Sequence, residues 1–450
     1  MIRLNFPELV TETTLVLQRA ALTNLGLMYA NGQGVERDFA QALRCYQQAA
    51  QAGAAQAQSN LAVMYAHGQG VEQDYVQARS WYAQAAEQGL AYAQANLAAL
   101  YANGQGGDVD YAQALRWYGA AAAQGDTTAQ LNLGVMYANG QGVDQDFSRA
   151  LECYRNGAAS GDPAAQYGLG VMYANGHGVE HDAAQAQHWY TQAAERGHVH
   201  AQFNLGFMFS SGEGSSLNPA LGLHWYERAA QAGDPAAQYN LGVMYSLGQG
   251  APKDTAQALQ WYTAAAQQGD AAAQYNLGLM YATGQGVDRD DVVALAWYQL
   301  AADQGDALAQ YNMGVMIANG QGTMASDEVA MQWLQLAADQ GEAQAQYDLG
   351  ALHQASKVPD LAKALACYRL AAAQSHPQAQ AALGWLYAHG AGVLQDYVRA
   401  HMWFNLGAVG GLAEAAQGRD HVAQQMTPAQ IAQAHERARA CQKNKFVDFD

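Results

Sequence analysis

Carboxylates, histidines and asparagines recur at fixed places in this chain and are its first candidates for chemistry. An aspartate returns at matching positions, usually 36 residues apart (74 − 38 = 36). A ladder of carboxylates could supply general acids and bases or bind cations. Each aspartate, however, stands just before a helical run, where its side chain would accept hydrogen bonds from the first backbone N–H groups. We therefore interpret the row as helix N-caps: Asp38, Asp74, Asp110, Asp146, Asp182, Asp254, Asp290 and Asp396.

The histidines give the nearest approach to a metal site. They cluster as His177, His181, His188, His198 and His200. No second set of ligands follows at a defined spacing, as a structural metal site would require. The sequence also lacks H-E-x-x-H, a nucleophile elbow, a Walker loop and a dinucleotide fingerprint. We therefore expect no catalytic residue, no metal and no cofactor, and we do not expect an enzyme.

Asparagine forms two ladders at fixed positions. One includes Asn24, Asn60, Asn96, Asn132, Asn204, Asn240, Asn276 and Asn312, and the other, seven residues further on, includes Asn31, Asn103, Asn139, Asn175 and Asn319. An asparagine side chain both donates and accepts, so it can pair with the N–H and C=O groups of a bound peptide. The alternative is that these side chains cap helix ends or form hydrogen bonds between repeats.

An aromatic row stands directly before the first asparagine ladder. The early copies have Thr23, Ser59, Ala95 and Leu131 here, whereas the later copies have Tyr167, Phe203, Tyr239, Tyr275, Tyr311 and Tyr347. Aromatic side chains with a polar tip are typical anchors in protein interfaces. The alternative is packing between adjacent helices. If the row faces a groove, we expect the C-terminal half to bind a ligand more strongly.

The elements that position these residues follow from a repeated motif, L-G-x-x-Y-x-x-G-x-G-V. Its leucine recurs from Leu25 to Leu349 at intervals of 36 residues (61 − 25 = 36), with Met313 in one copy, and the last copy begins at Leu383. A period of this size is typical of a solenoid. Within a copy, Asp234-Pro235 predicts the start of one helix and Asp254 the start of a second. The sequence predicts an all-α solenoid of about eleven helix-turn-helix repeats.

The repeat resembles the Sel-1-like repeats, relatives of the tetratricopeptide repeat. The front half is illustrated by residues 129–143 and the back half by residues 297–306, and the resemblance covers residues 20–412. It implies a right-handed superhelix whose first helices line a concave groove. It also implies an adaptor without chemistry of its own, in which asparagines of the first helices hold an extended peptide.

The two ends of the chain are expected to close the solenoid. We assign residues 1–19 to an N-terminal cap, residues 20–412 to the repeats, and residues 413–450 to capping helices and a short tail. Thr427, followed by proline and then Gln430, predicts a capping box that opens the final helix. In the sixth copy Asn218 is expected to cap the second helix. The tenth copy has lost its glycine turn near Ser356, which predicts a local change of superhelical pitch.

The composition limits the classes of partner that the chain is expected to bind. The 450 residues carry a formal charge of −18, which argues against nucleic acid because phosphate binding needs clustered Lys and Arg. Basic or neutral partners are favoured instead. No apolar run is long enough to span a membrane, and no export signal is visible. We expect a cytoplasmic monomer, although the mature form of a periplasmic or secreted protein would look the same.

The leading hypothesis is therefore a non-catalytic scaffold that binds an extended peptide or a partner protein in its concave groove. One alternative is a regulator of an enzyme or of an envelope-assembly complex, acting through its convex face or its ends. A second alternative is an exported factor that interacts with host proteins.

Overall fold

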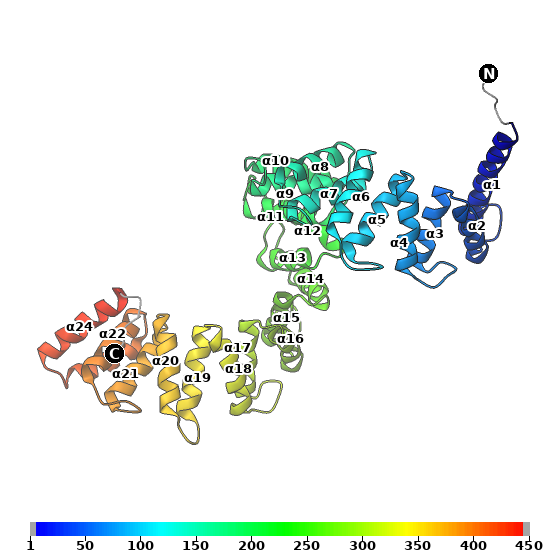
Figure 1. The fold of residues 1–450 in the computed structure, drawn as a ribbon. Coiled ribbons are helices and arrows are strands. Elements are labelled where there is room, and N and C mark those ends of the chain that lie inside the picture. The colour runs from blue at the N-terminus through cyan, green and yellow to red at the C-terminus, as the bar shows by residue number, and fades with distance from the viewer. Residues whose placement is uncertain (1–5, 444–450) are drawn as a thin grey trace. The chain divides into compact units, whose positions relative to one another are not determined.

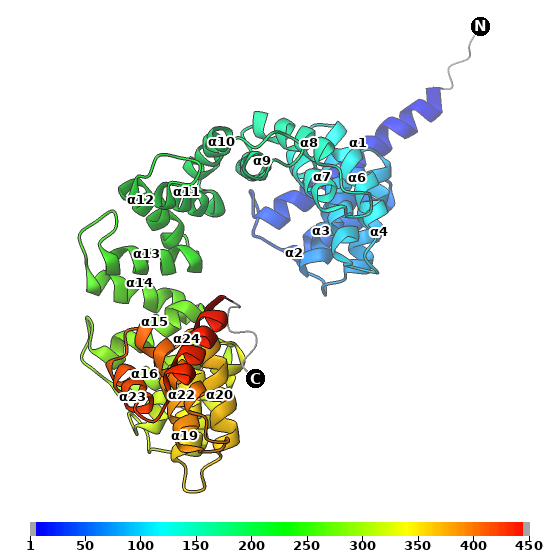
Figure 2. The ribbon, with the colours of Figure 1, turned by 90° about the vertical axis from the view of Figure 1, so that its left-hand side faces the viewer.

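The computed structural model describes residues 6–443, and their side chains from residue 14 onward. This range contains 24 α-helices and no β-strand. The chain divides into two compact units, residues 1–228 (unit 1) and residues 229–450 (unit 2). Within each unit the helices follow one another as pairs, as Figures 1 and 2 show. The predicted all-α solenoid is confirmed.

The helices of unit 1 alternate between the first and the second helix of a repeat. The first helices are α1 (Phe6–Asn31), α3 (Ala55–His67), α5 (Ala91–Asn103), α7 (Thr127–Asn139), α9 (Pro163–Asn175) and α11 (Val199–Ser211). The second helices are α2 (Phe39–Gln51), α4 (Tyr75–Glu87), α6 (Tyr111–Ala123), α8 (Phe147–Ala159), α10 (Ala183–Glu195) and α12 (Pro219–Gln231), within which the unit ends.

Unit 2 continues the alternation. Its first helices are α13 (Pro235–Leu247), α15 (Ala271–Thr283), α17 (Ala307–Ala318), α19 (Ala343–Ala355) and α21 (Pro377–His389). Its second helices are α14 (Thr255–Gln267), α16 (Asp291–Asp303), α18 (Asp327–Asp339), α20 (Leu361–Ala373) and α22 (Tyr397–Val409), followed by α23 (Ala413–Ala423) and α24 (Pro428–Lys443). Each first helix packs on the second helix of its own repeat and, within a unit, on that of the preceding repeat.

The aspartate row caps the second helices, as predicted. Asp254 illustrates it: its Oδ1 accepts hydrogen bonds from the backbone N–H groups of Ala256 and Gln257, both at 3.0 Å. The other seven aspartates also accept backbone N–H groups at their helix starts. Asn218 accepts from Leu221 N. These carboxylates therefore hold helices in place, and the row is not a catalytic ladder.

The core of most repeats is a buried leucine followed by a glycine. Leu241 has no exposed surface. A Cβ added to the next residue, Gly242, would lie 2.5 Å from the ring of Tyr262 on the partner helix. The absence of a side chain at Gly242 thus allows the two helices to approach closely. The first helix then ends at Gly248, whose φ of +73° is left-handed and favours glycine.

A row of buried glutamines joins successive repeats, which the sequence reasoning missed. Gln238 donates from Nε2 to the carbonyl of Ala230 (3.1 Å), and its Oε1 accepts from Gln268 Nε2 (2.8 Å). The same glutamine–glutamine bond recurs in the pairs Gln58–Gln88, Gln94–Gln124, Gln274–Gln304, Gln310–Gln340 and Gln346–Gln374. Each pair satisfies polar atoms that burial would otherwise leave without partners.

One buried glutamine lacks its glutamine partner, and this leads to a testable prediction. Gln130 Oε1 is buried without a hydrogen-bond partner, and the residue 30 positions later (160 − 130 = 30) is Ser160 instead of glutamine. Replacing Ser160 with Gln is expected to satisfy this atom and to raise the free energy of unfolding by about 0.5–1 kcal/mol, as measured by urea denaturation. In a Gln130→Ala background the same substitution should give no gain. An equal gain in both backgrounds would contradict the pairing.

The first and last described segments, residues 6–31 and 428–443, are helical. Thr427 and Gln430 form the predicted capping box, because Gln430 N donates to Thr427 Oγ1 (3.3 Å) and Thr427 N donates to Gln430 Oε1 (2.8 Å). At the other end α1 runs unbroken into the first repeat, so residues 6–19 of the expected N-terminal cap extend its first helix. Residues 1–5 and the expected tail after Lys443 lie outside the described residues.

Candidate protein-binding face

The predicted site residues lie on the first helices, whose successive members form what we call the first-helix face of each unit. Within a first helix, the residues two before and two after the motif leucine point away from the core position. In most repeats both are only partly buried, whereas the leucine between them is buried. This face is therefore where the first helices expose side chains to solvent.

The aromatic row is half-buried on this face. Every ring of the row except Tyr311 lies against the tyrosine of the second helix in its own repeat: the centroids of Tyr239 and Tyr262 are 6.0 Å apart, and those of Tyr275 and Tyr298 are 5.8 Å apart. The same pairing holds for Tyr167–Tyr190, Phe203–Tyr226 and Tyr347–Tyr368. One side of each ring thus contributes to packing within the repeat.

The tyrosines of the aromatic row lie beside the first asparagine ladder of the next repeat. Tyr167 lies close to the side chain of Asn204, Tyr239 to that of Asn276, and Tyr275 to that of Asn312. Tyr311 donates instead to Asp348 Oδ2 at 3.1 Å. Burial raises the pKa of all four tyrosines, so their hydroxyls stay protonated. The aromatic row and the first asparagine ladder therefore lie side by side across neighbouring repeats.

Side chains of the first asparagine ladder form hydrogen bonds within their own helices. The Nδ2 atoms of Asn132, Asn240 and Asn276 donate to the carbonyl four residues earlier, at 3.0, 2.8 and 2.8 Å. Members of the second ladder end the first helices, as Asn139 ends α7, and their side chains are exposed. The first ladder is thus largely occupied by intramolecular bonds, and the second remains open to solvent.

An apolar column on the same face was missed from the sequence. The residue two after the motif leucine is apolar in every copy and never buried: Leu27, Val63, Ala99, Val135, Val171, Phe207, Val243, Leu279, Val315, Ala351 and Trp385. Phe207 is 47% exposed and Trp385 is 43% exposed. An apolar residue within a helix is normally assigned to the core, which is why the pattern went unrecognised. It supplies the apolar contacts that a protein-binding face needs.

Cavities between consecutive first helices bring these groups together. The one between α7 and α9 has a volume of about 490 Å³; Val135 and Val171 line it together with Asn132, Asn139 and Tyr167. It opens where Leu131 replaces the tyrosine and Gly168 replaces the asparagine of other copies. Both asparagine ladders thus meet the apolar column at one cavity.

Three further cavities lie on the first-helix face. One of about 410 Å³ between α1 and α3 is lined by Asn31 and Asn60, and one of about 340 Å³ between α9 and α11 by Asn175 and Asn204. In unit 2, Trp385 lines a cavity of about 530 Å³ beside α23. The grooves therefore repeat the same combination of amide and apolar groups.

The clustered histidines act as structural side chains. His177 stacks on Phe147 with ring centroids 4.4 Å apart, and His198 stacks on Tyr167 at 4.5 Å. Across residues 6–443 no group of three or more His, Cys, Asp or Glu side chains is placed to hold a metal ion. The four cysteines are free thiols. No helix in the same range is long and apolar enough to cross a membrane.

Two histidines replace aspartate as caps of first helices. His376 Nδ1 accepts from Ala379 N (3.3 Å), and its Nε2 contacts Gln344 Oε1 (2.9 Å); His198 Nδ1 accepts from Ala201 N (3.3 Å). An accepting Nδ1 must be unprotonated. Burial lowers the pKa of both rings, which favours this neutral form.

Stability is therefore expected to depend on pH near neutrality. Because the folded-state pKa of each ring lies below its unfolded value of about 6.5, the unfolded chain binds more protons as the pH falls. The contribution of the two histidine caps to the free energy of unfolding should be complete above pH about 6.5 and should decrease as the pH falls below that value. Urea denaturation at pH 7.5 and at pH 5.5 measures this loss. A double variant, His198→Asn with His376→Asn, keeps neutral caps at both pH values. Its free energy of unfolding should fall less between pH 7.5 and pH 5.5 than that of the unaltered chain, and an equal fall would contradict the capping role.

Comparison with known proteins identifies the repeat. The sequence profile described as "Sel1 repeat" matches eleven consecutive segments, residues 19–53, 55–90, 91–126, 127–162, 163–198, 199–234, 235–270, 271–306, 307–342, 343–376 and 377–410. No curated protein sequence matches the chain.

Two solved structures are similar over most of their length. One is c5321, a protective antigen present in uropathogenic Escherichia coli strains that displays an SLR fold. It is 32% identical, covers 100% of this chain and 98% of its own, and has a TM-score of 0.78. The other, a Sel1 repeat protein from Oxalobacter formigenes, is 34% identical over 66% of this chain and 88% of its own, with a TM-score of 0.55.

Proposed function

We propose that this chain, which belongs to the Sel1 repeat family, binds an extended segment of a partner protein on its first-helix face. Sel1 repeat proteins are generally scaffolds for protein interactions and are typically non-catalytic. The finer assignment, to the grooves between first helices, is our proposal.

The cavity between α7 and α9 carries the proposal. Val135 and Val171 line it with apolar side chains, and Asn132 and Asn139 line it with amide groups. An apolar side chain of the partner would enter the cavity and lose contact with water. The exposed amide of Asn139 would pair with the partner's main chain, which every peptide offers regardless of sequence. The formal charge of −18 favours a segment that is basic or neutral.

In this proposal, residues other than the tyrosines make the main contacts with the partner. The sequence favoured stronger binding by the C-terminal half because the aromatic row lies mainly there. Because Tyr239 and Tyr275 pack on tyrosines of their own repeats and Tyr311 donates to Asp348 of the next repeat, these three tyrosines support the groove wall more than the contact itself. We therefore assign the anchoring role to the apolar column, with Phe207 and Trp385 as its largest exposed members.

A second candidate uses the opposite face. Leu300, Leu336 and Leu370 occupy equivalent positions on α16, α18 and α20 and are 48, 48 and 56% exposed. Exposed apolar residues that gather in this way mark interaction sites. This row favours the regulator that acts through its second helices. A third candidate, an exported factor that interacts with a host, is favoured by the description of the Escherichia coli relative as a protective antigen.

Affinity purification with quantitative mass spectrometry separates the first two candidates. The tagged chain is compared with a first-helix variant (Val171→Asp, Phe207→Asp) and a second-helix variant (Leu300→Asp, Leu336→Asp), after circular dichroism has verified that all three fold. We expect the partner to be lost from the first-helix variant alone. Loss from the second-helix variant alone would contradict the proposal and favour the regulator.

A further inference from the structure

One histidine of unit 2 lies in the core, at the contact with the last described helix. His401 on α22 is 3% exposed, and its Nδ1 atom is buried with no hydrogen-bond partner among the described residues. Most earlier second helices carry leucine at this position, as at Leu223, Leu259 and Leu295. The last repeat therefore has a titratable ring where its predecessors have an apolar side chain.

The helix that packs over His401 is held by small side chains. α24 lies on α22 (Figures 1 and 2), and its buried residues are Ala434, Ala438 and Cys441, which follow one side of the helix. His435, beside that stripe, meets His401 with ring centroids 5.1 Å apart. Small side chains bury little apolar area, so they stabilise this contact only weakly. A histidine from each helix thus lies where α24 docks on α22.

Few charged groups surround the His401 ring. His435 on α24 acts on it, as do Arg419 and Asp420 on α23. The third helix that packs on α22 is α21, which contains no Asp, Glu, Lys or Arg between residues 377 and 389. His435 and Arg419 oppose a positive charge on His401, and Asp420 alone among these groups favours one.

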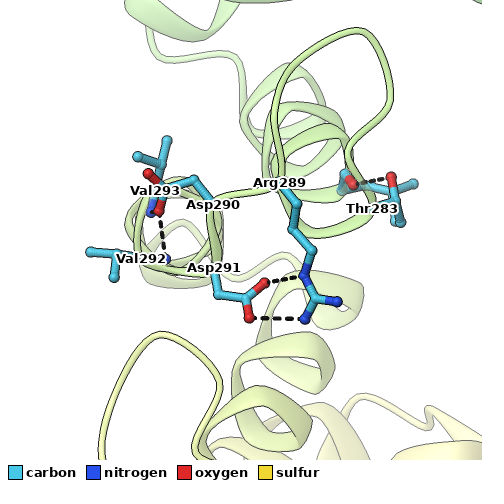
Figure 3. A network of polar contacts seen from close by, with 7 residues as sticks. Thr283, Arg289, Asp290, Asp291, Val292 and Val293 are labelled. Atoms are coloured by element: carbon cyan, nitrogen blue, oxygen red, sulfur yellow. Dashed lines mark hydrogen bonds and ion pairs between the residues drawn. The ribbon is translucent and has the colours of Figure 1, made fainter.

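Asp420 is poorly placed to offset such a charge. Its carboxylate pairs with the guanidinium of Arg419 at 2.8 Å, in the same way as Asp291 pairs with Arg289 at 2.8 Å in Figure 3. The side chain of Asp420 is also 68% exposed, and water weakens its attraction for a group in the core. A proton on His401 would therefore create a buried charge that no neighbour compensates.

The protonation of His401 is consequently coupled to the docking of α24. Burial, together with His435 and Arg419, lowers the pKa of the docked ring. Once α24 has moved away and water reaches the ring, its pKa returns to about 6.5. Because the docked ring has the lower pKa, docking is most favourable above pH about 6.5 and weakens as the pH falls below that value.

We propose that α24 detaches reversibly from α22 in acid, when His401 gains a proton, while the repeats stay folded. An imidazolium donates from both ring nitrogens, and the Nδ1 proton of His401 would have no acceptor in the core. Water supplies that acceptor once the covering helix has moved away. Detachment does not depend on the proposed partner binding, because His401 lies on a second helix and outside the first-helix face.

Cys441 reports the detachment, since it lies on the buried side of α24 and is 6% exposed. Its rate of reaction with dithiodipyridine is measured at pH 7.5 and pH 5.5 by mass spectrometry of the labelled peptide. Each rate is divided by that of N-acetylcysteine amide at the same pH. The ratio should rise by about three- to tenfold at pH 5.5, because one proton shifts the equilibrium by at most about tenfold per pH unit below 6.5. Cys45, buried in unit 1, should stay protected.

Three variants separate detachment from general unfolding by acid, after circular dichroism has verified that each folds at pH 7.5. His401→Leu, which restores the residue of most repeats, should remove the increase at Cys441. His435→Gln, at an exposed position, leaves the core unchanged and should make the increase smaller, because one positive neighbour is lost. His421→Gln, at an exposed position of α23, is the matched control and should keep the full increase.

Three results would overturn the proposal. The first is no increase at Cys441 in the unaltered chain. The second is an increase that His401→Leu and His435→Gln leave unchanged. The third is an equal increase at Cys45, which would show that acid unfolds the repeats together with α24.

Discussion

Replacing Trp403 with alanine is expected to lower the free energy of unfolding of unit 2 by about 3–5 kcal/mol, as for other fully buried large side chains. Trp403 is 1% exposed and lies in a core with Leu383 of α21, Val422 of α23 and Cys441 of α24. Removing the indole leaves a cavity beneath the terminal helices, whose attachment depends on that core. Urea denaturation followed by circular dichroism measures the loss, and limited proteolysis should cut first between α23 and α24.

The matched control is Trp297, which occupies the same column in an internal repeat. It is only half-buried, and Cys45, Cys153 and Cys367 replace it naturally in other copies. Trp297→Cys should therefore cost less than Trp403→Cys by at least about 1 kcal/mol, because less apolar area leaves contact with the protein. Equal losses at the two positions would show that the terminal helices do not bury Trp403 as described.

Introducing charge into the cavity between α7 and α9 is expected to weaken partner binding by at least about 30-fold, the effect typical of a hot-spot residue. The variant carries Val135→Asp and Val171→Asp, which line that cavity from neighbouring repeats. An apolar side chain entering there would have to desolvate two carboxylates. Calorimetric titration with the partner recovered by affinity purification gives the two dissociation constants.

Val76→Asp provides the control for that titration. Val76 lies in the same unit on the second helix α4 and is 62% exposed, away from the first-helix face. The affinity of the Val76→Asp variant for the partner should match that of the unaltered chain. If Val76→Asp weakens binding as much as the cavity variant does, charge anywhere on the unit is responsible and the cavity has no special role.

The repeats and their caps could be predicted from the sequence because each depends on residues close together in the chain. Asp254 is followed by helix-forming residues, and a cap needs only the next three backbone N–H groups. The leucine period likewise needs no knowledge of distant contacts. Local rules therefore suffice for the helices, their boundaries and their pairing.

The glutamine row could not be predicted in this way. Gln238 and Gln268 are 30 residues apart, and an isolated glutamine in a helix is normally exposed. A signal did exist, since glutamine precedes the motif leucine by three residues in copy after copy. Its interpretation requires the stacking of helices from different repeats, which only the structure provides.

The candidate site was predicted in part. Sequence placed the asparagines and tyrosines on the first helices, and in the structure the two rows lie side by side across repeats, as Tyr239 and Asn276 do. The cavity between α7 and α9 lies where these rows are interrupted, at Leu131 and Gly168. In the sequence, these two replacements look like the loss of binding residues. In the structure, they leave space that a ligand can occupy.

Site-specific photocross-linking tests the central claim most directly, because it reports contact and not merely loss of binding. Benzoylphenylalanine is placed at Val171, Phe207 or Trp385 on the first-helix face, and at Val76 or Leu336 on second helices. We predict cross-links to one partner protein from the first-helix positions and none from Val76 or Leu336. Cross-links from Leu336, with none from Val171, Phe207 or Trp385, would contradict the account.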